Sequence, residues 1–322
     1  RKGKMGFLSY VFYLLLNFAA YVCLAMVAFN WGSYFLMQGY VGLFKSQNLK
    51  KKYNAKWALV TGSSSGIGKS LAEKLAMQGI NVVLVALQEP LLDETFGALQ
   101  AQFKDVEFRK VGVNLGRRDA RYLEAIKEAT EDIDVQLVFN NAGYIVTGFF
   151  DQTTLEAQMA NLECNACAAV QITHHFVSEM LAKKLKGAVV FTSSAAAMMP
   201  APFSVMYGSS KAFISAFAAS VAAEVKARGI DVVAVHPSPV ASNFYDKTHK
   251  LGAIEFFKKF SVKPDELPDA IFASIGRSVL RDLGAVCVVF RLVNKICDAN
   301  FLASVTAGTA HTMDDYKKHI KA

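Results

Sequence analysis

The sequence is poor in cysteine and in charge. It has 5 cysteines in 322 residues, and charged residues make up 19% while hydrophobic residues make up 53%. An odd, irregular cysteine count excludes a disulfide scaffold, and so apolar a composition excludes a disordered chain. Cys164 and Cys167 have no second cysteine or histidine pair to complete a zinc site. We therefore interpret them as small residues packed on a helix and predict no metal.

A stripe of basic residues interleaved with aromatics, the pattern of a nucleic-acid surface, is also missing. The net charge is nevertheless +8. Many lysines lie next to an apolar segment near the start, where acidic lipid headgroups are the simpler partner. We predict no nucleic-acid partner.

The apolar segment is residues 6–29, which contain no charged residue. This run exceeds the roughly 20 residues that a spanning helix needs and is longer than the apolar part of a secretory signal. Tyr10, Trp31 and Tyr34 suit the membrane interface. The pattern predicts a transmembrane segment. The alternative, a buried core helix, is disfavoured because the domain that follows is complete without it.

Apolar character continues through residues 34–44, as a second short membrane element or an interfacial helix. One span and a hairpin therefore both remain open. Five basic residues follow the run (Lys45, Lys50, Lys51, Lys52, Lys56) against three before it (Arg1, Lys2, Lys4). The positive-inside rule then favours a cytoplasmic location for the domain that follows. We expect residues 1–52 to form a membrane anchor with a basic flank.

The rest of the chain alternates short apolar runs with helical patterns. The runs predict strands at 57–62, 81–87, 106–113, 135–143, 187–194 and 230–237. Helices are predicted at 67–78, 91–103, 118–130, 154–184 and 207–228, the fourth bent at an undetermined point. This alternation is typical of an α/β fold with a Rossmann-type, doubly wound parallel sheet.

Glycines gather between the first strand and the first helix of that sheet. Gly62, Gly66 and Gly68 enclose a short turn that also contains Ser64, Ser65 and Ile67. Glycines let the backbone approach a pyrophosphate closely, and the helix N-terminus offers free amides. The turn therefore predicts a dinucleotide site.

The motif Thr61–Gly68 (TGSSSGIG) and the run Asn140–Gly143 (NNAG) resemble the short-chain dehydrogenase/reductase family, over residues 56–245. The resemblance implies that Asn141 stabilises the sheet beside the adenine ribose. It places Asn114 where the family usually has an Asp that contacts adenine.

Residues 237–242 (PSPVAS) are similar to the family's PGxVxT segment, which lines the nicotinamide. The resemblance thereby assigns Pro237 and Val240 to the cofactor site. Ser238 and Ser242 depart from the family's Gly and Thr.

The end of the second strand bears on the choice of cofactor. No carboxylate stands directly at the strand end to repel a 2′-phosphate, and Lys69 is a candidate to reach one. Leu87 stands where NADP-preferring relatives often carry Arg, and Glu89 argues the other way. We predict NADP(H) in preference to NAD(H).

Tyr207 and Lys211 are spaced to share one helix face. A nearby ammonium favours the phenolate and lowers the phenol pKa from its usual value near 10. The resemblance implies that Ser194 holds the substrate oxygen, with Ser193 as a supporting hydroxyl. It also implies that Asn165 holds a water in a proton relay to Lys211.

An apolar anchor together with these motifs resembles the hydroxysteroid dehydrogenase and 3-ketoacyl-CoA reductase branch. This implies hydride exchange between a nicotinamide dinucleotide and a lipid-like carbonyl or alcohol, at the endoplasmic reticulum or another intracellular membrane. Family members commonly pair through the helices that carry Asn165 and Tyr207, so we expect a homodimer. Residues 53–245 would be the catalytic domain and 246–322 a substrate lid.

Within the lid, residues 283–302 are interpreted either as a core helix or as a helix that touches the bilayer. The sequence has no GxSxG motif, which disfavours a hydrolase, and we interpret His236 as a strand-end packing residue. The alternative function is a catalytically retired family member that serves as a structural subunit of a membrane complex. Leu87, Asn114 and Ser238 suggest it.

Overall fold

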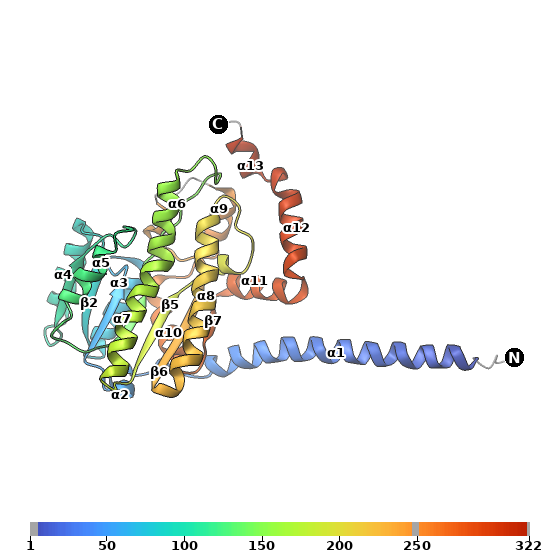
Figure 1. The fold of residues 1–322 in the computed structure, drawn as a ribbon, viewed down its shortest axis with the longest axis horizontal. Coiled ribbons are helices and arrows are strands. Elements are labelled where there is room, and N and C mark those ends of the chain that lie inside the picture. Colours follow the sequence, from blue (N-terminus) through green and yellow to red (C-terminus); the bar gives the residue numbers. More distant parts are fainter. Residues whose placement is uncertain (1–5, 247–250, 321–322) are drawn as a thin grey trace. The chain divides into compact units, whose positions relative to one another are not determined.

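The computed structural model describes residues 6–246 and 251–320, and the chain divides into two compact units between Leu43 and Phe44 (Figure 1). The first unit is a single helix, α1 (Phe7–Gly42), of 36 residues without a charged side chain. At 1.5 Å per residue it is about 54 Å long, more than the roughly 30 Å hydrocarbon core of a bilayer.

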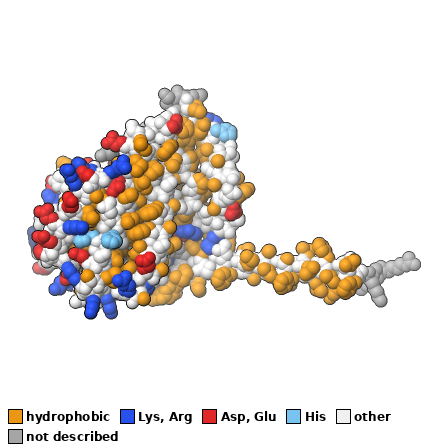
Figure 2. Space-filling view, viewed as in Figure 1, with side chains coloured by type: hydrophobic (Ala, Val, Ile, Leu, Met, Phe, Trp, Pro, Cys, Tyr) orange, Lys and Arg blue, Asp and Glu red, His pale blue; other side chains and the backbone are white. Residues whose placement is uncertain are grey.

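Hydrophobic side chains cover α1 along its length (Figure 2). It is the one helix of the described residues that is long and apolar enough to cross a membrane. The two apolar stretches of the sequence, 6–29 and 34–44, therefore belong mainly to one continuous helix, and no hairpin turn separates them.

The second unit is built on one seven-stranded sheet in the order β3-β2-β1-β4-β5-β6-β7. All neighbouring strands pair in parallel. The strands are β1 (Trp57–Thr61), β2 (Asn81–Ala86), β3 (Phe108–Gly112), β4 (Val135–Asn140), β5 (Gly187–Thr192), β6 (Ile230–Pro237) and β7 (Leu280–Leu283). The first six confirm the predicted strands. The seventh was not predicted, because two adjacent charged residues interrupt its four residues (LRDL), which are too few to show a strand pattern.

Helices cover both faces of the sheet. They are α2 (Leu49–Tyr53), α3 (Gly66–Met77), α4 (Pro90–Gln102), α5 (Arg121–Glu128), α6 (Leu155–Leu162), α7 (Ala168–Ala182), α8 (Val205–Val225), α9 (Gly252–Lys258), α10 (Leu267–Ser274), α11 (Ala285–Ile296), α12 (Ala299–Thr309) and α13 (Asp314–His319). One core cluster joins α3, α4 and α10 to the sheet, and the other joins α5, α7 and α8. In Figure 1, α7 and α8 cover the face turned to the viewer.

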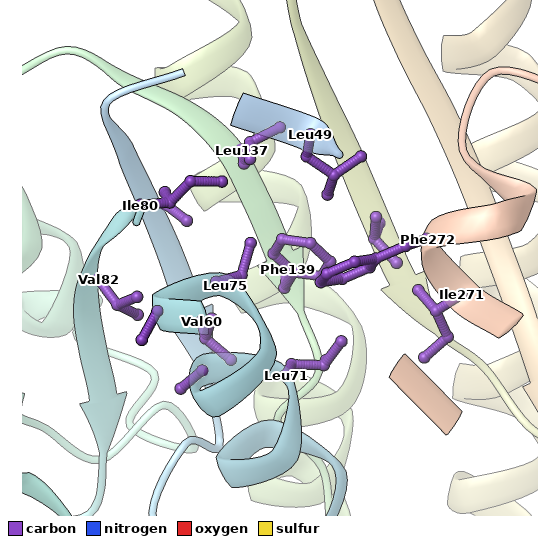
Figure 3. Close-up of a cluster of buried hydrophobic side chains, with 14 of the residues drawn as sticks. Leu49, Val60, Leu71, Leu75, Ile80, Val82, Leu137, Phe139, Ile271 and Phe272 are labelled. Atoms are coloured by element: carbon purple, nitrogen blue, oxygen red, sulfur yellow. The ribbon is translucent and has the colours of Figure 1, made fainter. Parts of the chain in front are cut away.

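The first core shows how burial orients the helix that follows the glycine turn. Leu71 and Leu75 of α3 are fully buried and point towards the strands (Figure 3). Phe139 of β4 lies with its ring centroid 5.8 Å from that of Phe272 of α10. Burying side chains of this size stabilises the fold by about 1.5–3 kcal/mol each, and it fixes where the N-terminus of α3 points.

The predicted helix 154–184 is interrupted. A π-helical turn, Glu163–Cys167, separates α6 from α7 and inserts one residue into the hydrogen-bond ladder. The turn contains Asn165, which is buried. Sequence periodicity could not locate this turn, because the apolar spacing on either side of it still fits a helix.

Part of the predicted basic flank packs on the globular unit as helix α2. Leu49 and Tyr53 of α2 are buried, and the Tyr53 hydroxyl donates to the carboxylate of Asp231. Lys52 Nζ lies 3.1 Å from Asp231 Oδ2, and Lys50 Nζ donates to the Gly79 carbonyl at 2.6 Å. These two lysines, which the sequence assigns to the membrane flank, therefore bind groups within the globular unit.

The segment 283–302 contains two helices rather than one. The N-cap Asp298 accepts from the amides of Asn300 and Phe301 and starts α12 anew after α11. In α11, Val286 and Cys287 are buried while Ile296 is 67% exposed. No residue of α12 is buried. One face of α11 therefore belongs to the core, and α12 lies on the surface.

Candidate active site

The glycine turn forms a backbone cradle at the carboxyl end of β1. Gly62 has a φ of +65° and donates to the Val85 carbonyl at 2.8 Å. A Cβ at Gly68 would lie 2.1 Å from the Gly62 carbonyl oxygen, so a side chain there cannot be accommodated. Gly66 begins α3 with a φ of +54°. The N-cap residue of this helix, Ser65, makes no side-chain hydrogen bond to the helix amides. The first amides of α3 are thus left to bind an anion.

The other predicted cradle residues lie in the same turn. Ser64 and Ile67 are half-buried, and the Ser64 carbonyl accepts from Thr95 Oγ1 at 2.8 Å. Thr95 belongs to α4, so this bond holds the turn against the next helix. The shape of the cradle fits a dinucleotide pyrophosphate.

Asn141 holds three strand ends together beside the cradle. Its Nδ2 donates to the Thr61 carbonyl at 3.1 Å, and its Oδ1 accepts from Thr192 Oγ1 at 3.0 Å. The Thr61 hydroxyl in turn accepts from the amides of Asn141 and Ala142, each at 2.9 Å. Sequence reasoning missed Thr61 and Thr192. A hydroxyl at the end of an otherwise apolar buried strand was the available signal.

Asn114, Leu87 and Lys69, the residues predicted to lie near the adenosine end of the cofactor, have different degrees of exposure. Asn114, after β3, is exposed, and its Oδ1 accepts from the Gly116 amide at 2.8 Å. Leu87, after β2, is 45% exposed. Lys69 is half-buried in the first turn of α3 and forms no ion pair within the described part of the chain.

Tyr207 and Lys211 lie near the start of α8, and Lys211 is 3% exposed. Lys211 Nζ donates to the Thr192 carbonyl at 2.8 Å and lies 5.7 Å from the centroid of the Tyr207 ring. A Cβ at Gly143 would lie 3.1 Å from this Nζ and 3.0 Å from Asn165 Oδ1. The NNAG run, Lys211 and Asn165 therefore meet at one point.

Burial governs the ionisation of this pair. It raises the pKa of the Tyr207 phenol, with the Ser194 hydroxyl opposing the shift. This is opposite to the lowering that we expected from Lys211. Burial also lowers the pKa of Lys211 to about 8, and Cys164 opposes that shift. A lysine that is partly neutral near pH 8 favours the tyrosinate less than a fixed ammonium would.

The Asn165 side chain is bound to the backbone of Tyr144. Its Oδ1 accepts from the Tyr144 amide at 3.0 Å, and its Nδ2 donates to the Tyr144 carbonyl at 2.9 Å. A cavity of about 10 Å³ lies between Asn165 and Lys211 and is also lined by Asn140. That volume is about one water molecule, so the predicted relay water has a place near Asn165.

The two serines that follow β5 have different roles. Ser193 is buried, and its Oγ donates to the Lys211 carbonyl at 2.9 Å. Ser194 is half-buried on the side of Tyr207, and its Oγ accepts from the Ala196 amide at 3.1 Å. This is consistent with the preference for Ser194 as the substrate-facing hydroxyl and for Ser193 as its support.

The segment after β6 completes the site. Pro237 and Val240 are buried, and a Cβ at Gly66 would lie 3.3 Å from Ser242 Cβ, which brings this segment against the cradle. Ser238, which departs from the family's Gly, turns away, and its Oγ accepts from the Cys287 amide at 3.2 Å. A Cβ at Gly284 would lie 2.5 Å from Ser238 Oγ, so the serine at position 238 leaves room only for a glycine at position 284.

We expect the buried Lys211 to oppose folding at neutral pH. Its pKa is about 8 in the folded protein against an ordinary 10.5. Burial of the charged side chain therefore lowers the free energy of unfolding by its full amount below pH 8, and this loss fades as the pH rises to 10.5. Lys211→Met should therefore raise stability at pH 7 by on the order of 3 kcal/mol and by much less at pH 10. Thermal unfolding at both pH values measures this, and an equal gain at both would contradict it.

The site lies where the strand order reverses, between β1 and β4, at the carboxyl ends of the strands. That is where doubly wound sheets bind dinucleotides. Together with the Tyr–Lys pair, this defines a dinucleotide-dependent oxidoreductase. Residues 56–250 match the short chain dehydrogenase family, and the protein belongs to that family.

Two curated relatives have names that refer to hydroxysteroids or to very-long-chain acyl thioesters. The chain is 29% identical to hydroxysteroid dehydrogenase-like protein 1 of Gallus gallus over 238 residues, which are 73% of this chain and 70% of that protein. It is 32% identical to the very-long-chain 3-oxoacyl-CoA reductase of Anas platyrhynchos over 190 residues, 58% of this chain. The match spans 60% of that reductase's own length.

Solved structures share the fold. A 7beta-hydroxysteroid dehydrogenase superposes with a TM-score of 0.70 at 25% identity, covering 80% of this chain and 99% of that one. A short-chain dehydrogenase from Sphingobium yanoikuyae, in complex with NADPH, gives a TM-score of 0.63 at 26% identity, covering 74% and 92%.

Proposed function

We propose that this oxidoreductase uses NADP(H) to interconvert a carbonyl and an alcohol on a lipid-like substrate, a ketoacyl thioester or a ketosteroid. The observation that carries the chemistry is the convergence of Lys211 and Asn165 at Gly143, with the Tyr207 ring near Lys211 and Ser194 beside the Tyr207 phenol. The names of the curated relatives support the substrate class.

The dinucleotide supplies the hydride when it is bound. Tyr207 gives its phenolic proton to the developing alkoxide, and a raised pKa keeps that phenol protonated at neutral pH. Ser194 holds the substrate oxygen beside the phenol. Lys211 returns a proton to Tyr207, and Asn165 holds the relay water next to Lys211.

The preference for NADP(H) rests on charge near the 2′ position. Leu87 brings no negative charge to the end of β2, and Lys69 lies in the first turn of α3 beside the cradle. An ammonium that bonds a phosphate contributes about 1.5–3 kcal/mol. We expect Lys69→Ala to weaken NADPH binding about 10- to 100-fold and to leave NADH unchanged.

Nicotinamide fluorescence titration measures both dinucleotides. Lys74→Ala is the matched control, because Lys74 lies on the same helix but pairs with Asp269 at 2.8 Å. Equal weakening of NADPH and NADH by Lys69→Ala would argue against the phosphate contact.

We further propose that α1 anchors the protein in the endoplasmic reticulum or another intracellular membrane, with the catalytic unit in the cytoplasm. The length of α1 and its lack of charge support the anchor. Resistance to alkaline extraction, with protease access from the cytoplasmic side only, is the expected result. Release by alkali would exclude a spanning anchor.

Residues 246–322 would form the substrate lid on the catalytic domain, 53–245, with residues 1–52 as anchor and flank. We also propose a homodimer that pairs through the helices carrying Asn165 and Tyr207. The outer face of α8 supports it, because small exposed residues there flank Phe213, which is 48% exposed. A monomer in sedimentation of the detergent-solubilised protein would refute the pairing.

The function itself is tested by turnover. Purified full-length protein with NADPH should reduce a long-chain 3-ketoacyl thioester or a ketosteroid, followed by loss of nicotinamide fluorescence. Dinucleotide binding without turnover of either carbonyl would instead favour the retired, structural alternative.

A further inference from the structure

A buried chain of polar side chains runs from the back of the catalytic helix to α11. Ser193 Oγ and Ser215 Oγ lie 2.8 Å apart, and each lies 2.9 Å from the Lys211 carbonyl oxygen. Ser215 Oγ lies 2.9 Å from His236 Nε2. The Lys211 carbonyl therefore lies beside two hydroxyls, one of which is also within hydrogen-bond distance of an imidazole.

The chain continues on the other side of the imidazole. His236 Nδ1 lies 3.2 Å from Asp282 Oδ1, and both residues are at least 95% buried. Arg291 of α11 binds the same carboxylate through Nε at 3.0 Å and through a terminal nitrogen at 3.1 Å. His236 is thus a polar link and not only the packing residue that the sequence suggested.

The carboxylate determines how the imidazole is protonated. Burial alone would raise the pKa of Asp282, but the neighbouring His236 and Arg291 hold it well below its usual range. The carboxylate lies 3.2 Å from Nδ1 without the alignment of a hydrogen bond, and its negative charge favours a proton on that nitrogen. In the neutral imidazole, Nε2 is then an acceptor, so Ser215 donates to it, and Ser193 is left to donate to the Lys211 carbonyl. Ser215 lies on α8 one turn after Lys211, so fixing its side chain fixes that turn of the catalytic helix.

Distances from Ser215 through His236 to Asp282 resemble those of a nucleophilic triad. The surroundings do not suit that role. Ser215 lies in the middle of α8 with its hydroxyl against the Lys211 carbonyl and Ser193, and Asp282 is shared with a bidentate arginine. What the chain can do is hold groups in place.

We propose that His236 is a positioning residue that holds the turn of α8 after Lys211 through Ser215 and ties α8 to α11 through Asp282 and Arg291. Both helices are seen in Figure 1. The position of α11, in the C-terminal segment, thereby sets the geometry of Lys211 and of Ser194, which follows Ser193. The inference rests on the proposed function for its kinetic test.

Ser215→Ala removes the link from α8, and Arg291→Met removes the one from α11. We expect each to lower kcat about tenfold while the Kd for NADPH changes less than twofold. Ser220→Ala is the matched control, because Ser220 makes the same bond to the residue four positions earlier (3.0 Å to Ala216) but is exposed and outside the chain. A kcat of Ser215→Ala or Arg291→Met equal to that of Ser220→Ala would overturn the proposal.

Two isosteric changes at His236 give a second kinetic readout. In His236→Gln the side-chain amide lies near the Nε2 position and keeps the contact to Ser215. In His236→Asn the amide lies near the Nδ1 position and keeps the contact to Asp282. Because Ser215 fixes the turn of α8 that follows Lys211, His236→Gln should retain more of kcat than His236→Asn. Equal losses of kcat in the two variants would contradict the assignment that His236 acts on α8 through Ser215.

Wild-type protein that binds NADPH but turns over no carbonyl would refute the proposed function and not this inference. In that case hydrogen exchange in α8 remains the test. Ser215→Ala should speed amide exchange around residues 211–218 relative to Ser220→Ala. Identical exchange in the two variants would refute the positioning role independently of activity.

Discussion

Tyr207→Phe should lower kcat for carbonyl reduction by about 10²- to 10⁴-fold, the usual contribution of a positioned general acid. The phenol is the one group that we assign to give a proton to the substrate oxygen, and its raised pKa keeps that proton available at neutral pH. The Kd for NADPH should change little, because Lys211 and the cradle remain. Steady-state kinetics and fluorescence titration measure the two quantities separately.

Tyr122→Phe is the matched control for Tyr207→Phe. Tyr122 is a buried tyrosine whose hydroxyl donates to Glu163 at 2.7 Å, away from the glycine cradle. It should leave kcat within about twofold of the wild type, since its bond contributes about 1 kcal/mol to folding only. If Tyr207→Phe keeps wild-type turnover, another group supplies the proton.

Gly68→Ala should abolish dinucleotide binding. The new Cβ would lie 2.1 Å from the Gly62 carbonyl oxygen and 2.7 Å from Asn141 Nδ2. The turn, or the clamp that Asn141 forms between the strand ends, must therefore shift. Overpacking of this kind costs about 1–3 kcal/mol, and it moves the amides that would hold the pyrophosphate. Isothermal titration with NADPH measures the loss.

Gly97→Ala is the control for the added methyl group. Gly97 lies inside α4, and a Cβ added there would meet no atom within 4 Å beyond the backbone of its own helix. The substitution should keep NADPH affinity and stabilise the protein by about 1 kcal/mol, the difference between Gly and Ala in a helix interior. Wild-type NADPH affinity in Gly68→Ala would show that the turn does not hold the pyrophosphate.

The fold was predictable because its signals are local. Six strands appear as buried apolar runs such as Asn81–Ala86, and the glycine turn stands between a strand and a helix. β7 and α2 were missed, since LRDL and LKKKY owe their structure to partners far away in the chain. β7 pairs with β6, and Tyr53 of α2 binds Asp231.

The site was predictable only in part. The motifs identified Tyr207, Lys211 and the glycines, but not the environment that sets their ionisation. We expected Lys211 to lower the pKa of Tyr207, yet burial raises it and brings Lys211 itself to about 8. Burial is a property of the folded chain, which a spacing of four residues does not contain.

By itself the sequence determined the parallel α/β fold, the family, the apolar helix and the candidates for the site residues, because each depends on periodicity or on short motifs. Only the tertiary structure decided that Asn165 lies in a π turn and that His236 links Ser215 to Asp282. The second relation joins residues from α8, β6 and β7. Their hydrogen bonds exist only once the sheet has brought those elements together.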